Sequence, residues 1–267
     1  MMNVVVFFSG GASAFRSMLD DPSHGKLYQV VAGVTNVGDA KGRKLFEDEN
    51  IEVLHYPLNF KSFDVEAAKP LYDEVLNGLR RFNPDIIALS GFMRLVTYPL
   101  IEHGDMAGEY SSRVFNVHPA DLAILSGQRN ERFYAGNLNS REVRILAGDN
   151  ELRRKYKGED AVYDAVQSGE KYTKSTVHIA TEDFDEGPIL VQSKPFLVKD
   201  KVSRWIEQRN FRPVRKYADE LQERMKWEGD GPAFCRALEM AALGELSLYG
   251  NEVYRSGIPL TYNGVQL

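Results

Sequence analysis

The chain has few of the residues that build disulfide frameworks and metal centres. It contains one cysteine, Cys235, and five histidines among its 267 residues. A single cysteine excludes an intrachain disulfide and a zinc site made of several thiolates. Because Cys235 falls in a helical pattern, we expect a small core residue rather than a nucleophile. The histidines are scattered, with no pair spaced four apart beside an acidic residue, so the sequence predicts no metal site.

Long apolar runs and blocks of like charge are missing as well. No apolar segment approaches the roughly 20 residues that cross a bilayer. Residues 4–8 are too short a run for a signal peptide and follow no basic segment. These absences predict a cytoplasmic protein without a membrane partner. The net charge is −5 at pH 7, which argues against broad binding to nucleic acid but leaves a local basic patch open.

The rest of the composition is that of an ordinary globular protein, with 43% hydrophobic and 27% charged residues. Strand patterns alternate with helical patterns along the first 118 residues. The expected strands are 3–8, 28–35, 52–55, 85–89 and 113–118, and the expected helices are 15–19, 40–49, 64–82 and a short one near 99–102. Strands separated by helices indicate right-handed βαβ units and a parallel sheet.

The second half of the chain breaks this rhythm. Residues 121–157 are rich in arginine, asparagine and glycine, with one strand pattern at 143–146, and a loop of this length is usually functional or mobile. Only a short acidic turn separates the strands 175–180 and 189–196, so these should pair antiparallel. Helical patterns are expected at 160–168, 201–228 and 232–243, followed by a terminal hairpin.

These patterns predict an α/β fold. We expect a Rossmann-like, mostly parallel sheet flanked by helices, with an antiparallel strand pair and a helix-and-hairpin extension towards the C-terminus. Residues 1–198 would form the main domain, including the insertion 121–157, and residues 199–267 would be an extension of that domain. The insertion begins directly after the strand 113–118. We therefore expect it to form a lid or a contact between two copies in a homodimer.

A glycine turn joins the first strand to the first helix. It reads Ser9-Gly10-Gly11-Ala12-Ser13-Ala14, and its main-chain N–H groups and the positive end of the helix could face an anion. The stretch matches neither G-x-G-x-x-G nor a Walker sequence. A tight turn that needs glycine for steric reasons explains it equally well.

Three polar residues could meet at one end of the sheet. Asn116 and His118 alternate along the strand 113–118 and leave the same face at its C-terminal end, where open α/β sheets bind their ligands. Asp185 lies in the turn between two later strands. An amide and a protonated imidazole can stabilise a developing oxyanion, and a carboxylate can orient the imidazole. Direct acyl transfer and hydrolysis both suit this set, and a structural asparagine with a capping histidine stays the alternative.

These motifs together resemble the folate-dependent formyltransferase family. The likeness rests on Asn116-x-His118-Pro119, on Ser175-Thr176-Val177-His178-Ile179-Ala180-Thr181, and on Asp183-Phe184-Asp185-Glu186-Gly187-Pro188. The turn at 9–13, the segment 84–95 and Tyr156-x-Gly158 support it in the same order. The resemblance runs from residue 3 to about 198 and is interrupted by 121–154.

The resemblance implies a reaction and a site. A primary amine of a small phosphorylated substrate, such as glycinamide ribonucleotide, would attack the formyl carbon of 10-formyltetrahydrofolate through a tetrahedral intermediate. His118 would be the general acid, Asn116 would hold the formyl oxygen, and Asp185 would raise the pKa of His118. The resemblance also implies a pocket and a phosphate loop. The pterin pocket would be lined by Phe92, Met93, Arg94, Leu95, Val96 and Asp183, and the phosphate would bind Gly11, Ala12, Ser13 and Ala14.

Departures from the family pattern concern the substrate. The family's phosphate loop usually reads Ser-Gly-Asn-Gly-Ser-Asn, and here Gly11, Ala12 and Ala14 replace its Asn, Gly and Asn. About thirty residues are inserted after Leu122. Alternatives that keep the three polar residues are a 10-formyltetrahydrofolate deformylase, which uses water, and a formyltransferase for an amino sugar nucleotide. A methionyl-tRNA formyltransferase disagrees with the acidic charge and short C-terminal tail, and a non-catalytic binding module disagrees with the retained polar set.

Overall fold

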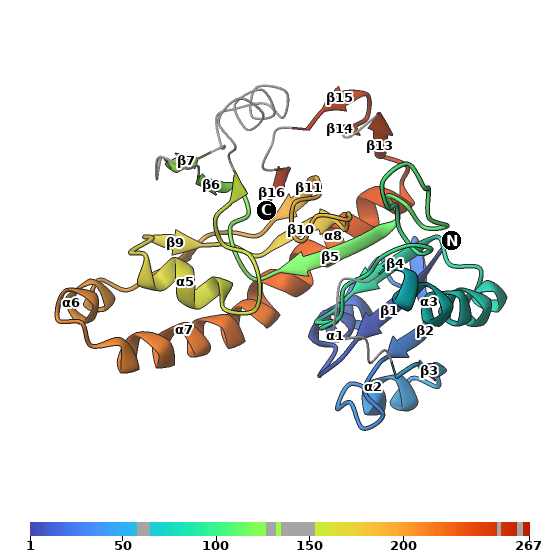
Figure 1. The fold of residues 1–267 in the computed structure, drawn as a ribbon, viewed down its shortest axis with the longest axis horizontal. Helices are drawn as coiled ribbons and strands as arrows, with labels where there is room; N and C mark the ends of the chain where they lie inside the picture. Colours follow the sequence, from blue (N-terminus) through green and yellow to red (C-terminus); the bar gives the residue numbers. More distant parts are fainter. Residues whose placement is uncertain (58–64, 127–131, 135–152, 250–251, 261–263) are drawn as a thin grey trace. The chain divides into compact units, whose positions relative to one another are not determined.

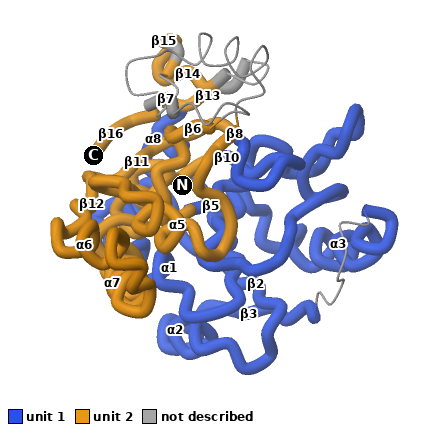
Figure 2. Tube along the Cα trace, turned by 60° about the vertical axis from the view of Figure 1, so that its left-hand side comes forward, with its two compact units in different colours: residues 1–117, 179–187, 238–244 blue, residues 118–178, 188–237, 245–267 orange. Residues whose placement is uncertain are grey.

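The computed structural model describes residues 1–57, 65–126, 132–134, 153–249, 252–260 and 264–267. The chain divides into two compact units. Unit 1 comprises residues 1–117, 179–187 and 238–244, and unit 2 comprises residues 118–178, 188–237 and 245–267 (Figure 2). Their boundary passes through a strand after Val117. The expected division at residue 198 stays a prediction.

Unit 1 is built on five parallel strands in the order β5-β4-β1-β2-β3 (Figure 1). These strands are β1 (Met2–Phe8), β2 (Tyr28–Thr35), β3 (Val53–His55), β4 (Ile86–Leu89) and β5 (Val114–His118). Val4, Val5, Val6, Phe7 and Phe8 are all fully buried, as expected for a strand of a parallel sheet that is covered on both faces. The predicted Rossmann-like parallel sheet is thus confirmed.

Alternate residues of β1 pack against helices on opposite faces. Val5 and Phe7 contact a core that includes Tyr72 and Val75 of α3 (Val65–Leu79). On the other face, Phe8 and Phe46 stack with ring centroids 5.0 Å apart, and Phe15 and Phe46 stack at 4.0 Å. Phe15 and Phe46 come from α1 (Ser13–Asp20) and α2 (Arg43–Asp48). A β-carbon on Gly33 of β2 would lie 2.8 Å from the Phe46 ring, so this aromatic stack requires glycine there.

The segment between β4 and β5 differs from the prediction. We expected a short helix near 99–102, but the chain forms successive turns there. The N–H groups of Leu100 and Ile101 both donate to the carbonyl of Thr97. The peptide bond before Pro99 is cis, and proline supplies no N–H of its own. The N–H of His103 donates to Met106 instead, so the turn does not continue into a helix.

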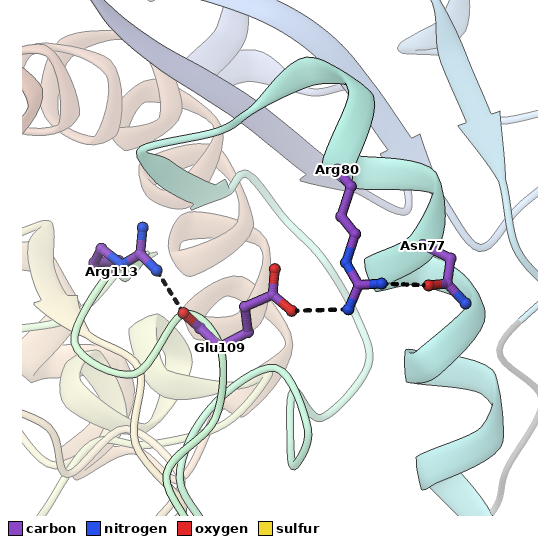
Figure 3. Close-up of polar contacts among 4 residues, drawn as sticks. All are labelled: Asn77, Arg80, Glu109 and Arg113. Atoms are coloured by element: carbon purple, nitrogen blue, oxygen red, sulfur yellow. Dashed lines mark hydrogen bonds and ion pairs between the residues drawn. The ribbon is translucent and has the colours of Figure 1, made fainter.

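Four polar residues tie α3 to the start of β5 (Figure 3). Arg80, in the 3-10 turn Arg80–Phe82 after α3, donates to Asn77 at 2.9 Å and lies 3.5 Å from the carboxylate of Glu109. Arg113, just before β5, donates to the main-chain oxygen of Glu109. These contacts lie at the N-terminal ends of β4 and β5, opposite the edge where α/β sheets bind ligands. We read them as structural, and exposed pairs of this kind stabilise by less than about 1 kcal/mol.

Unit 2 contains the predicted antiparallel hairpin. Its strands are β10 (Thr176–Ile179) and β11 (Ile189–Gln192), with Val177 opposite Val191. The C-terminal β16 (Val265–Gln266) pairs in parallel with β11, a contact that the sequence did not predict. The expected strand 189–196 is split, because β12 (Phe196–Leu197) leaves β11 and pairs with β9 (Tyr172–Thr173).

Helices α5 (Ala161–Gln167), α6 (Lys201–Glu207) and α7 (Phe211–Met225) share one apolar core in unit 2. A π-helical turn at Lys226–Asp230 leads from α7 into α8 (Gly231–Ala242), which carries the buried Cys235. The terminal hairpin is confirmed as β13 (Leu246–Tyr249) and β14 (Glu252–Arg255), which β15 (Ile258–Pro259) extends.

Only part of the insertion is described. Strand β6 (Ile124–Ser126) pairs with β7 (Arg132–Tyr134) on one side and with β8 (Arg153–Arg154) on the other. The strand expected at 143–146 lies outside the described residues. Among the helices that the structure describes, none is long and apolar enough to cross a membrane.

Candidate active site

The glycine turn at the end of β1 presents main-chain donors. Ala12 has φ 51° and ψ 44° and precedes α1 without a side-chain cap. The N–H of Ala14 donates to Oγ of Ser90 at 3.2 Å. Within the described residues, the N–H groups of Gly11, Ala12 and Ser13 make no hydrogen bond to protein. A left-handed residue at the start of a helix arranges successive N–H groups in a concave, anion-binding geometry.

A hydrogen-bonded chain connects this turn to two neighbouring strand ends of unit 1. Oγ of Ser9 donates to Oδ1 of Asn36 at 2.6 Å and accepts the N–H of Met93 at 2.8 Å. Asn36 directly follows β2, and Met93 lies just beyond β4. The expected phosphate loop and the expected pterin segment are therefore held by the same serine hydroxyl.

The segment Phe92–Val96 is fixed by its main chain and exposes selected side chains. The hydroxyl of Tyr72 donates to the carbonyl of Leu95 at 2.6 Å. Phe92 and Val96 are buried, whereas Met93 is 48% exposed. Burial raises the pKa of Tyr72, so its hydroxyl stays protonated and remains a donor at ordinary pH. The accessible thioether of Met93 can therefore contact a flat aromatic ring.

The turn after β10 places Asp185 in an uncommon conformation. Asp185 is 4% exposed and has φ 56°, a left-handed conformation that aspartate adopts more readily than most residues. The carbonyl of Asp183 accepts the hydroxyl of Thr181 at 3.2 Å and the N–H of Glu186 at 3.2 Å. A β-carbon on Gly187 would lie 1.8 Å from the carbonyl oxygen of Ile179, so the path of the turn requires glycine at that position.

The same turn is held from outside by a loop of unit 1. The carboxylate of Glu182 accepts the N–H of Gly104 at 3.0 Å, and its second oxygen lies 2.9 Å from Nδ1 of His103. The exposed Phe184, which is 50% accessible, completes the turn. The acidic turn is therefore positioned by main-chain geometry and by Glu182 together.

His118 ends β5 and belongs to unit 2. Its side chain is buried, and Nε2 lies 3.0 Å from the carbonyl oxygen of Tyr156. The hydroxyl of Tyr156 donates to the carboxylate of Glu170, which is also buried. Nζ of Lys155 lies 3.7 Å from that carboxylate and 4.8 Å from the centre of the Tyr156 ring. The ring of His118 is thus oriented by a residue that is itself anchored by a buried acid.

The predicted site residues are divided between the two units. The residues 11–14, 92–96, 183 and 185, together with Asn116, belong to unit 1, and Asn116 pairs with Leu89 in the β4–β5 ladder. His118 belongs to unit 2. That Asn116, His118 and Asp185 meet around one carbonyl carbon stays a prediction. Among the described residues, no group of acidic, histidine or cysteine side chains could hold a metal ion.

Sequence reasoning missed one supporting group in each unit. Asn36 could have been found, since it is the first residue after a buried strand and therefore lies at the carboxyl edge of the sheet. Glu170 carried no comparable pattern. Its contact with Tyr156 joins residues on either side of α5, and only the folded arrangement of that helix brings them together.

Comparison with known proteins decides the family. The family model described as formyl transferase matches residues 2–130 and 138–218. This chain belongs to the formyl transferase family. A chloroplastic phosphoribosylglycinamide formyltransferase from Arabidopsis thaliana is 27% identical over 235 residues, 85% of this chain and 68% of that protein. The Escherichia coli phosphoribosylglycinamide formyltransferase is 26% identical over 195 residues, 72% of each.

Solved structures share the fold. The phosphoribosylglycinamide formyltransferase of Coxiella burnetii, in complex with CHES, superposes with a TM-score of 0.67 at 21% identity and covers 100% of this chain and 99% of its own. A formyltetrahydrofolate deformylase from Pseudomonas syringae gives a TM-score of 0.63 at 19% identity, with 95% of this chain and 65% of its own covered. The fold is therefore shared by solved proteins whose names state different reactions.

Proposed function

We propose that this formyltransferase moves a formyl group from 10-formyltetrahydrofolate to the primary amine of a small phosphorylated substrate. Glycinamide ribonucleotide is the acceptor we favour, since relatives from Arabidopsis and Escherichia coli are named for its formylation. As part of the same proposal, the partners are small molecules and the reaction is cytoplasmic.

One observation supports a phosphorylated acceptor most directly. Gly11, Ala12 and Ser13 present N–H groups that bond no described residue, at the start of an uncapped helix. Ala12 is buried and Ser13 is partly buried, whereas Gly11 is exposed, and N–H groups of buried residues are almost always paired. A phosphate group would supply the missing acceptors and interact favourably with the helix dipole. Because the N–H of Ala14 already bonds Ser90, the proposed contacts come from the three residues before it.

The residues of the expected pterin pocket fit a folate in their chemistry. Met93 and Phe184 are both about half exposed in segments with fixed main chains. A flat heteroaromatic ring would bury part of these apolar side chains. Asp183 and the backbone of residues 92–96 would supply the polar contacts that orient the ring.

The proposed chemistry follows from the tautomer of His118. The carbonyl of Tyr156 can only accept, so Nε2 of His118 carries a proton and Nδ1 is the atom that gains or loses one. We assign to the charged imidazole the donation of a hydrogen bond to the oxyanion that forms when the amine attacks the formyl carbon. Asn116 would donate to the same oxygen, and Asp185 would favour the charged imidazole and accept the proton that the amine releases. When the intermediate collapses, the bond between the formyl carbon and N10 of the folate breaks and a proton passes to N10, which leaves the formamide and tetrahydrofolate.

The test is an absorbance assay of folate turnover with the whole chain. Purified protein is mixed with 10-formyltetrahydrofolate alone, then with glycinamide ribonucleotide, and then with an amino sugar nucleotide. We expect turnover that depends on glycinamide ribonucleotide. Turnover without an amine would replace the proposal with a deformylase, and turnover only with the sugar nucleotide would replace the acceptor. No turnover with any of them would overturn the enzyme assignment.

A further inference from the structure

A buried polar network in unit 2 holds the main chain directly after His118 and Pro119. Its members are Asp121, Thr176 and Gln192, called the Asp121 network below. Thr176 and Gln192 are 0% exposed and Asp121 is 3% exposed. Buried polar groups of this kind are retained only with hydrogen-bond partners, and here the partners are the residues that follow the proposed general acid.

Thr176 fixes two of these residues from β10. Its hydroxyl donates to the carbonyl of Ala120 at 2.6 Å and accepts the N–H of Leu122 at 3.3 Å. Asp121 caps the next N–H itself, because its Oδ1 accepts from Ala123 at 3.0 Å. Three main-chain groups within residues 120–123 are thereby bonded to buried side chains.

Gln192 connects this segment to β11. Its Nε2 donates to Oδ1 of Asp121 at 2.8 Å and to the hydroxyl of Thr176 at 3.1 Å. Its Oε1 accepts from Nζ of Lys174 at 3.3 Å. A carboxylate only accepts and an ammonium only donates, so these partners fix which way the amide points.

We propose that the Asp121 network is a positioning device for His118, with Thr176 and Gln192 as its positioning residues. Strand β5 ends at His118 and Pro119 has no N–H to donate, so the strand ladder stops there. In place of the ladder, the hydrogen bonds of the Asp121 network hold the main chain of residues 120–123. They thereby fix the position of His118 at the end of β5. The inference rests on the proposed function, in which the placement of the imidazole decides the rate. A misplacement of about 1 Å can cost a catalytic group roughly a hundredfold in rate.

The experiment compares two threonines of unit 2 that are equally buried. Thr176→Val keeps the shape of the side chain and removes the hydroxyl with its three bonds. Thr173→Val is the matched control, because Thr173 is 1% exposed and its hydroxyl has no partner within the described part of the chain. Thr176→Ser restores a hydroxyl at the first site. Formyl transfer is measured as kcat and KM for both substrates, with the active fraction counted by titration with a folate analogue.

We expect Thr176→Val to lower kcat per active site tenfold or more while both KM values change less than threefold. Thr176→Ser should recover most of the rate, and Thr173→Val should stay within twofold of the wild type. If the lost rate only matched a lost active fraction, or if both valine variants behaved alike, the positioning role would be refuted. Should Thr176→Val not fold, Gln192→Met removes the same link from the other strand and carries the same expectation.

A second readout separates this inference from the proposed function. Imidazole ¹⁵N NMR signals of His118, assigned by their absence in His118→Asn, are compared in the two valine variants. We expect them to shift in Thr176→Val and to stay in place in Thr173→Val, whether or not formyl transfer is detected. A wild type inactive with every amine would defeat the proposed function alone, whereas unmoved His118 signals in Thr176→Val would defeat the positioning role alone.

Discussion

Nε2 of His118 and the carbonyl oxygen of Tyr156 lie 3.0 Å apart. This contact joins the end of β5 to a residue 38 positions later, near the end of the insertion 121–157. Since a carbonyl cannot donate, it selects the tautomer with the proton on Nε2. The imidazole therefore enters the proposed reaction already oriented, and proton movement is confined to Nδ1.

Removing the imidazole should stop the reaction without abolishing folate binding. We expect His118→Ala to lower kcat by at least a hundredfold and to change the Kd of a folate analogue less than tenfold, because the group acts mainly in the transition state. Steady-state kinetics and fluorescence titration measure the two quantities. His55→Ala, at an exposed histidine at the end of β3, is the control and should keep its rate. A His118→Ala enzyme with near-normal kcat would remove this residue from the mechanism.

Removing the hydroxyl of Tyr156 should destabilise the protein. Tyr156→Phe leaves the buried carboxylate of Glu170 without one hydrogen bond, and bonds to charged groups contribute about 1.5–3 kcal/mol. Chemical unfolding measures the change. Tyr172→Phe is the comparison in the same unit, because Tyr172 is only partly buried and within the described residues its hydroxyl makes no hydrogen bond. Equal losses in the two variants would show that the Glu170 contact contributes nothing specific.

Two substitutions at Asp185 should separate charge from backbone conformation. Asparagine tolerates the left-handed backbone found there, whereas alanine is strained by about 1–2 kcal/mol. We expect Asp185→Asn to lose roughly a hundredfold in kcat with a small change in Tm, and Asp185→Ala to lose both rate and Tm. Steady-state kinetics measures kcat and calorimetry measures Tm on the same samples of each variant. If Asp185→Asn kept its rate, the carboxylate would have no part in proton movement.

Asp230 should make stability depend on pH. Burial raises its pKa to about 7, and the Ser175 hydroxyl and the charge of Lys226 oppose this only in part. An acid whose pKa is higher in the folded state binds more protons there, so the free energy of unfolding falls as pH rises from about 4 to 7. Above that window the ionised carboxylate costs up to about 4 kcal/mol. We expect the free energy of unfolding of Asp230→Asn, relative to that of the wild type, to be highest at pH 8. This difference in unfolding free energy should shrink towards pH 4. A difference in unfolding free energy that did not vary with pH would contradict this account.

Much of the fold follows from local patterns. The apolar runs of β1 and β2 and the one-sided stripe of α3 each specify burial within a single segment, so their positions could be predicted. The short β16 could not, since two residues carry no periodicity and its pairing with β11 is set by a distant strand. The turns at 97–101 could not be told from the short helix expected near 99–102, because the main-chain bonding around Pro99 is not visible in the sequence.

The candidate site divides in the same way. Asn116, His118 and Asp185 were chosen because their chemistry and their places at strand ends are visible in the sequence. The residues that hold these three side chains in place are not visible in the sequence. In the sequence Thr176 stands out only as part of a family motif, and Gln192 is an ordinary strand residue. The fold places the amide of Gln192 between Asp121 and Lys174. Such supporting contacts join distant segments, so no single stretch of sequence reveals them.

The buried position of Cys235 makes this chain convenient for fluorescence work. It is the one cysteine in the sequence, and its side chain in α8 is 8% exposed, so thiol-reactive dyes should label the natural protein slowly. A new cysteine at exposed Phe184 would then carry a single dye beside the proposed folate pocket. Quenching of that dye would measure the binding of a folate in real time. The wild-type protein, treated with the same dye, would be the control for labelling at Cys235.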